Sequence, residues 1–249
     1  GIIDNRPQIS RNTLQINRGN HTYAELAFLA GVEASEWSWG PVFLDVDLDG
    51  YEDILVTNGQ LRDFQNADMA REIEMAKANK RLTQNQIVEL VRYFPNLRTP
   101  NVAFQNRGDG SFEEVGGKGG FAEPGISQGM ALADLDNDGD MDVVMNNLHE
   151  VAGVYENQAG AARLSVQLAG RSPNSAGVGA AIRVIGMRVG QSQEMIAAGR
   201  YLSADQPVRT FAASTTGNHA IEVQWRSGVK TLIKDIPANY AYEIAEPET

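Results

Sequence analysis

Two stretches of nine residues share one arrangement of carboxylates and glycine, and they constrain the fold of this 249-residue chain more than any other feature. Asp occupies positions 1, 3, 5 and 9 of each stretch, Gly occupies position 6, and position 7 offers a backbone carbonyl. Calcium takes about six to eight oxygen ligands on a flexible frame, and alternating Asp residues in a tight loop supply them. We therefore expect two Ca²⁺ sites. The predicted ligands are Asp45, Asp47, Asp49, Tyr51 and Asp53 in the first stretch, and Asp134, Asp136, Asp138, Asp140 and Asp142 in the second.

Apolar residues flank both acidic stretches. Val42-Phe43-Leu44 precedes the first stretch, Ile54-Leu55-Val56 follows it, and Val143-Val144-Met145 follows the second. A helix–loop–helix calcium site needs a bidentate Glu at position 12, whereas position 12 here falls in these apolar runs. Short apolar runs are typical of buried strands. The sequence thus predicts strand–loop–strand calcium sites. The alternative, a solvated acidic turn, is disfavoured because the pattern occurs twice with matching flanks.

The acidic loops belong to a longer internal repeat with an offset of 89 residues. Asn17 begins a short hairpin ahead of the first loop, and Asn106 begins the corresponding hairpin ahead of the second. Glycine in each hairpin supplies the positive φ that such turns need. Repeated short strands with turns at fixed places indicate propeller blades or a related array. A third unit starts at residues 154–157 without a third acidic loop, so we expect an incomplete propeller.

Residues 60–98 are an insertion in the first unit, and their hydrophobic period is helical. Apolar residues within 87–94 recur at helical spacing, a capping box begins at Thr83, and Pro95 follows the last turn. An earlier helix is expected over Asp68–Lys77. A helical hairpin that covers a sheet edge is the simpler interpretation, and a cap that faces a ligand is the alternative.

From about residue 161 onward, the acidic loops give way to strands with alternating side chains. Residues 164–168 and 221–225 alternate apolar and polar positions, as half-buried strands do. We therefore predict a mainly β protein in two parts. Residues 1–160 hold the two repeats and the insertion, and residues 161–249 form an all-β, sandwich-like domain.

Composition excludes several classes of protein. The net charge of −11 argues against nucleic acid and anionic membrane surfaces as partners, because both attract basic proteins. The chain has no Cys, which excludes disulfides and thiolate metal sites, and no apolar run approaches the length of a membrane span. His21, His149 and His219 stand in no catalytic motif, and the carboxylates are accounted for as calcium ligands. We therefore expect no enzyme activity.

Both units resemble the FG-GAP/VCBS repeat of integrin-alpha-type propellers, in the D-x-D-x-D-G-x-x-D loops and in the hairpins that precede them. Residues 163–246 resemble the ASPIC/UnbV domain, in Gly177–Ala180, Gly199–Ser203 and Val223–Gly228. The resemblance implies calcium bound between strands and an extracellular, cell-surface or periplasmic location. It also implies a propeller with more blades than this sequence holds, so we expect the sequence to be the tail end of a longer protein.

The leading interpretation is a non-enzymatic, calcium-binding, extracytoplasmic module that recognises or scaffolds a protein or a carbohydrate ligand. The alternative is a non-catalytic accessory section of a polysaccharide-processing enzyme. Exposed aromatic side chains near Trp37 and Trp39 in one groove would favour sugar binding. A flat apolar patch would instead favour a protein partner.

Overall fold

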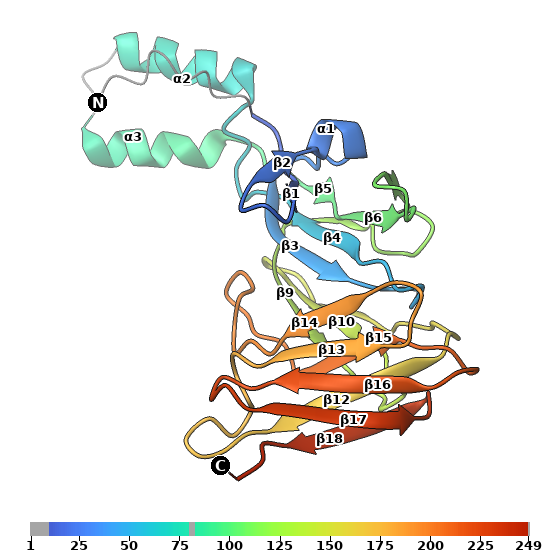
Figure 1. Cartoon of the computed structure of the whole chain (residues 1–249). Helices are drawn as coiled ribbons and strands as arrows, with labels where there is room; N and C mark the ends of the chain where they lie inside the picture. Colours follow the sequence, from blue (N-terminus) through green and yellow to red (C-terminus); the bar gives the residue numbers. More distant parts are fainter. Residues whose placement is uncertain (1–9, 80–82, 249) are drawn as a thin grey trace.

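The computed structural model describes residues 10–79 and 83–248 and shows a mainly β protein with few helices (Figure 1). The strands of the first part are β1 (Gln15–Asn17), β2 (Tyr23–Glu25), β3 (Ser38–Leu44), β4 (Asp53–Asn58), β5 (Thr99–Pro100), β6 (Val102–Asn106), β7 (Phe112–Glu114), β8 (Pro124–Gly125), β9 (Ser127–Ala133), β10 (Asp142–Asn147) and β11 (Gly153–Tyr155). The later strands are β12 (Arg163–Ala169), β13 (Ala181–Ile185), β14 (Gln191–Glu194), β15 (Val208–Ala212), β16 (His219–Gln224), β17 (Lys230–Ile236) and β18 (Tyr240–Ala245). The helices are α1 (Ala27–Ala30), α2 (Ala67–Asn79), α3 (Gln84–Leu90) and a 3-10 turn at Val91–Tyr93. The prediction of a mainly β fold is confirmed.

Two antiparallel sheets in the first part repeat one strand order. One sheet has the order β3-β4-β6-β7, and the other has β9-β10-β11. The bounds of β9 and β10 lie 89 positions after those of β3 and β4, at both ends of each strand. Every residue of β4 is buried, because Leu55 faces one core cluster while Ile54 and Val56 face another. The two acidic stretches therefore connect equivalent strands of the two sheets.

A separate two-stranded sheet, β1-β2, repeats the geometry of the hairpin β6–β7. Asn17 pairs with Tyr23 in the first hairpin, and Asn106 pairs with Phe112 in the second. In both turns, the residue after the Asn donates its backbone N–H to a carbonyl four residues further on, at 3.0 Å. The 89-residue repeat therefore extends from the acidic loops to these hairpins.

The strands from β12 onward form two sheets that share one core. Their orders are β15-β12-β18 and β14-β13-β16-β17, and β12 runs parallel to β18. Val166 and Phe211 from the first sheet pack with Ile182, Ile221 and Val223 from the second, and all five side chains are fully buried. The alternation of side chains noted in the sequence places one face of each strand in this core.

The segment that leads into β15 lies along β9 and joins the two parts. The backbone N–H of Gln206 donates to the carbonyl of Leu132 at 2.9 Å, and that of Leu132 donates to Asp205 Oδ1 at 3.0 Å. Val208 packs with Met130 and Leu132 in one buried cluster. The sandwich thus packs against β9, the strand that leads into the second acidic loop.

Helices α2 and α3 lie within the predicted insertion and project from the β sheets (Figure 1). The capping box is present, since Thr83 Oγ1 accepts the backbone N–H of Gln86 and Gln86 Oε1 accepts that of Thr83. The α-helix ends at Leu90, earlier than the sequence pattern suggests, because the next residues tighten into the 3-10 turn before Pro95. The side chain of Ile87, the first apolar position of that pattern, lies outside the described part of the chain.

The two ends of the insertion lie side by side. Gln60 and Leu97 exchange backbone hydrogen bonds of 2.9 Å in both directions. Beyond this bridge, Arg98 forms an ion pair with Glu150 and donates to the carbonyl of Pro124. The root of the insertion is therefore closed by contacts that do not involve its helices.

Replacing residues 62–95 with a short Gly/Ser linker is expected to preserve cooperative unfolding. The Gln60–Leu97 bridge stays in place, and the entropy cost of closing a loop changes slowly with its length. The melting temperature in calcium should therefore shift by less than about 4 °C. Circular dichroism during heating checks this result. Loss of the cooperative transition would instead show that the helices belong to the core.

Candidate metal centres

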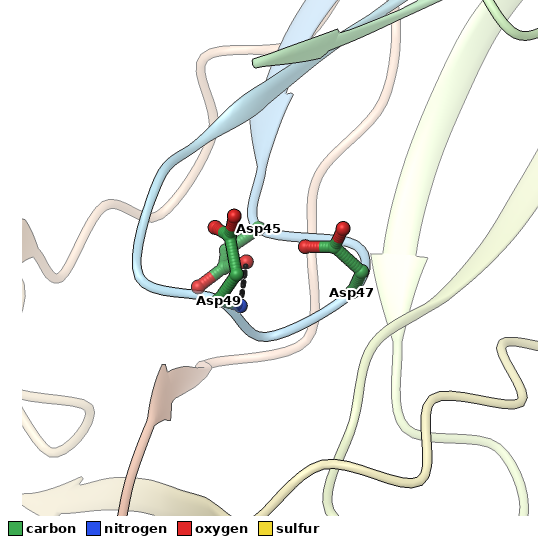
Figure 2. A group of neighbouring side chains, drawn as sticks. All are labelled: Asp45, Asp47 and Asp49. Atoms are coloured by element: carbon green, nitrogen blue, oxygen red, sulfur yellow. Dashed lines mark hydrogen bonds between the residues drawn. The ribbon is translucent and has the colours of Figure 1, made fainter. Parts of the chain in front are cut away.

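The loop between β3 and β4 folds around its first carboxylate. Asp45 Oδ1 accepts the backbone N–H of Asp49 at 3.0 Å, and Asp45 Oδ2 accepts that of Gly50 at 2.8 Å. Gly50 has a φ of 96°, in the left-handed region that favours glycine. Figure 2 shows the carboxylates of Asp45, Asp47 and Asp49 gathered inside this loop.

The loop between β9 and β10 has the same contacts at equivalent positions. Asp134 accepts the backbone N–H groups of Asp138 and Gly139, one on each oxygen, both at 3.1 Å. Position 4 is left-handed in both loops, although it is Leu48 in one (φ 57°) and Asn137 in the other (φ 62°). The two loops therefore share their backbone shape together with the hydrogen bonds among positions 1, 5 and 6. The side chain at position 4 differs between them and is not needed for that shape.

Three carboxylates in each loop lie close enough to hold one cation. In each loop, one carboxylate oxygen from positions 1, 3 and 5 lies within 4.8 Å of the other two. This spacing suits a shared Ca²⁺ with oxygen ligands at about 2.3–2.6 Å. The residues are Asp45, Asp47, Asp49, Asp134, Asp136 and Asp138. The backbone carbonyls of Tyr51 and Asp140 at position 7 remain predicted ligands.

The carboxylate at position 9 stands outside these groups in the described chain. Asp53 and Asp142 are buried, and one oxygen of each accepts a hydrogen bond from the backbone N–H of position 2 in its own loop. The other oxygen accepts a backbone N–H from the next unit, that of Asn106 or Asn157, and all four distances lie between 2.7 and 3.1 Å. The position-9 carboxylate therefore holds its own loop to the start of the next unit. Each of its oxygens still has a second lone pair that could bind a metal ion, so its role as a ligand stays a prediction.

Polar side chains from distant elements also reach the loops, and the sequence does not single them out. Gln105 on β6 donates Nε2 to Asp47 Oδ2 at 2.7 Å. Arg163, the first residue of β12, places Nη2 at 2.7 Å from Asp138 Oδ2 and donates Nε to the Asp138 carbonyl at 2.8 Å. Each contact joins an acidic loop to a strand that is far away along the chain, so no local sequence pattern could have predicted it.

Burial and mutual repulsion oppose the negative charge of the loops. Burial raises the pKa of Asp45 to about 7 and the pKa of Asp53 to about 6, and the neighbouring carboxylates add to both shifts. Burial also raises the pKa of Asp134, and it raises the pKa of Asp140 to about 7 with a contribution from Asp138. A divalent cation would favour the ionised forms and so remove this opposition.

Asp140 is the carboxylate of the second loop whose charge is least satisfied by hydrogen bonds. Its side chain is 1% exposed, and neither carboxylate oxygen has a hydrogen-bond partner in the described chain. Arg163 forms an ion pair with it at 3.8 Å, longer than a hydrogen bond. A buried carboxylate without hydrogen bonds is costly. This orphaned group, beside a donor set made only of hard oxygen atoms, fits calcium.

Calcium-free protein is expected to be more stable near about pH 5 than near about pH 7.5. An Asp whose pKa is higher in the folded state than its ordinary 3.8 binds more protons when folded, so stability falls as the pH rises between the two values. For Asp45 and Asp140, this window runs from the ordinary 3.8 to about 7. Thermal unfolding in EDTA across this range measures the slope, and Asp140→Asn should reduce it. A melting temperature that rises with pH over this range would contradict the prediction.

Trp37 and Trp39, which the sequence singled out, have different surroundings in the described part of the chain. The ring of Trp39 packs against Tyr201 with centroids 5.2 Å apart, and Trp39 Nε1 donates to the carbonyl of Gly59. Trp37 lines a separate hollow with Glu33. In the described ranges, no helix has the length and apolar character needed to cross a membrane.

Two family models match separate parts of the chain. Residues 84–145 match the FG-GAP-like repeat, a range that includes the second acidic loop. Residues 170–249 match the family described as ASPIC and UnbV, which covers most of the sandwich. No curated protein matches the chain. The architecture inferred from the motifs, an FG-GAP repeat followed by an ASPIC/UnbV domain, is confirmed.

Proposed function

We propose that this chain is a calcium-stabilised, non-enzymatic module that binds or scaffolds a protein or carbohydrate partner outside the cytoplasm. FG-GAP repeats are typical of extracellular or surface proteins, and together with the ASPIC/UnbV match they suggest a binding or accessory module. Our proposal goes further in three respects: the module binds calcium, it has no catalytic activity, and its calcium sites are the two acidic loops.

One observation carries the proposal: the same acidic loop occurs twice with the same internal hydrogen bonds. Asp45 and Asp134 each hold the backbone N–H groups of positions 5 and 6, and each leads a group of three converging carboxylates. The position-9 carboxylates connect the same loops to Asn106, the last residue of β6, and to Asn157, which follows β11. An ion bound at each loop would therefore stabilise the packing of its sheet, which is a structural role.

We assign the sheets β3-β4-β6-β7 and β9-β10-β11 to propeller-type blades, and the hairpin β1–β2 to the outer part of a further blade. The equal spacing of the strands and the matching hairpin register support this assignment. We also retain the division into residues 1–160, which include the insertion at about 60–98, and residues 161–249. The chain changes there from the repeat to the sandwich strand β12.

The loop carboxylates suit a structural role better than acid–base catalysis. Asp45, Asp53, Asp134 and Asp142 already hold backbone N–H groups, so their orientation is committed to the fold. Recognition of a partner would then fall to other surfaces, which the loops keep in place. Calcium-loaded protein should release no reducing sugar from a panel of polysaccharides, and release of sugar would overturn the non-enzymatic part of the proposal.

The metal assignment is tested by comparing calcium with magnesium. Magnesium demands compact octahedral coordination and keeps its waters, whereas calcium accepts an irregular set of carboxylates and carbonyls. Millimolar calcium added to EDTA-treated and dialysed protein should raise the melting temperature clearly, and the same concentration of magnesium should raise it much less. Equal effects of the two ions would argue for charge screening rather than a calcium site.

A further inference from the structure

A cavity of about 290 Å³ lies where both blade sheets meet the sandwich. Phe43 on β3 and Leu132 on β9 line one side, and Ser192 on β14 and Arg209 on β15 line the other. This volume is close to the lower end of the range for ligand pockets, about 300–1,000 Å³. The cavity therefore has room for a ligand of monosaccharide size.

Arg209 is the unusual group in this cavity. Arg209 is buried, with only 7% of its surface exposed. Nε donates to the carbonyl of Glu194 at 3.0 Å, and Nη1 donates to the carbonyl of Val208 at 2.8 Å. A guanidinium has five N–H donors, so three of them have no acceptor among the described residues. Nor does any acidic side chain of residues 10–79 and 83–248 form an ion pair with Arg209.

The other arginine of the cavity is already neutralised. Arg200 donates two hydrogen bonds to Asp205, from Nε to Oδ1 at 3.1 Å and from Nη2 to Oδ2 at 2.7 Å. Asp205 Oδ1 also accepts the backbone N–H of Leu132. Asp205 is therefore held by hydrogen bonds to Arg200 and to β9, and it acts on Arg209 only through space. Among the described residues, no carboxylate hydrogen-bonds to Arg209.

We propose that this cavity binds a small sugar acid, with the ligand carboxylate on Arg209. The planar fork of a guanidinium matches a carboxylate with two parallel hydrogen bonds, which are stronger than neutral ones. A single buried arginine in a cavity that is also lined by the acidic residues Glu52, Glu194 and Asp205 suits one carboxylate better than a more highly charged phosphate.

Other groups around the cavity suit the remaining atoms of a sugar. Ser192 and Glu52 are exposed and line the cavity, so they can exchange hydrogen bonds with ring hydroxyls. Phe43 is 49% exposed and offers an aromatic face to the apolar side of a ring. The choice of a sugar rests on the carbohydrate-binding half of the proposed function, whereas the carboxylate rests on Arg209 alone.

The first test is a titration of calcium-loaded protein with glucuronate and glucose, followed by ligand-observed NMR and calorimetry. These two sugars differ at one carboxylate, so glucuronate should bind at least about tenfold more tightly. Inorganic phosphate and glycine serve as further probes and should bind more weakly than glucuronate. Equal binding of glucose, tighter binding of phosphate or glycine, or no binding of glucuronate would overturn the proposal.

The site is assigned with variants of Arg209 and Ser192. Arg209→Gln removes the charge and should abolish the preference for glucuronate. Because Arg209 is buried and the variant could fail to fold, Ser192→Glu provides a second test at an exposed position. Its new carboxylate should occupy Arg209 and weaken glucuronate binding at least about tenfold, whereas the matched neutral variant Ser192→Gln should not. Unchanged binding in a folded Ser192→Glu variant would place the sugar acid elsewhere. Calcium binding by the loops is measured separately, so failure here leaves the calcium proposal intact.

Discussion

Removal of calcium is expected to lower the midpoint of thermal unfolding by about 10–20 °C. If each loop binds calcium with a dissociation constant of about 10⁻⁵ M, millimolar calcium stabilises the fold by about 2.7 kcal/mol per site. In a chain of this size, each kcal/mol corresponds to about 2–4 °C. The cause is the repulsion among three converging carboxylates per loop, which calcium replaces with attraction.

Variants of single loops should divide this shift into two parts. Asp47→Ala and Asp136→Ala each remove an exposed carboxylate from one group of three, and each should keep about half of the calcium-dependent shift. The double variant should lose the shift. Differential scanning calorimetry in EDTA and in calcium measures all four proteins. A wild-type melting temperature that stays the same after verified calcium removal would contradict the structural role.

The second large effect is expected at position 9, and it should already be present without calcium. Asp142 is 1% exposed, and its oxygens accept the backbone N–H groups of Leu135 at 2.7 Å and Asn157 at 2.8 Å. Asp142→Ala would leave both N–H groups without their acceptor. We therefore expect a loss of about 2–4 kcal/mol in the free energy of unfolding, in EDTA as well as in calcium.

The matched control for Asp142→Ala is Asp136→Ala in the same loop. Asp136 is exposed and accepts one longer hydrogen bond, from the backbone N–H of Asp138 at 3.2 Å. In EDTA its removal should change the free energy of unfolding by no more than about 0.5 kcal/mol. Urea denaturation in EDTA compares the two variants. Equal destabilisation by both would show that position 9 has no special role in holding the loop to Asn157.

The acidic loops and the repeat could be predicted from the sequence because their signals are local. Gly50 and Gly139 stand where the backbone needs a positive φ, and each loop lies between apolar strands at a constant offset. The insertion could be predicted for the same reason, since the capping box at Thr83 is made by residues three positions apart. Short-range patterns of this kind depend on backbone geometry, which the residue types report directly.

Contacts between distant segments could not be predicted in this way. Asn157 donates its side-chain Nδ2 to the carbonyl of Val46, so the start of the third unit contacts the first loop. Arg163 reaches Asp138 because β12 begins next to the second acidic loop. The cavity at Arg209 exists only because strands of four different sheets meet there. The sequence also suggested Asp53 as a ligand from its spacing alone, and it contained no signal that both oxygens of this residue hold backbone N–H groups.

The most direct test of the central claim is the number of calcium ions bound per chain. Equilibrium dialysis of metal-free protein against millimolar calcium, followed by elemental analysis, measures this number. We expect two ions for the wild type, one each for Asp47→Ala and Asp136→Ala, and none for the double variant, in line with one group of converging carboxylates per loop. Calcium bound to wild type and to the double variant in equal amount, or no calcium bound to the folded wild type, would contradict the account.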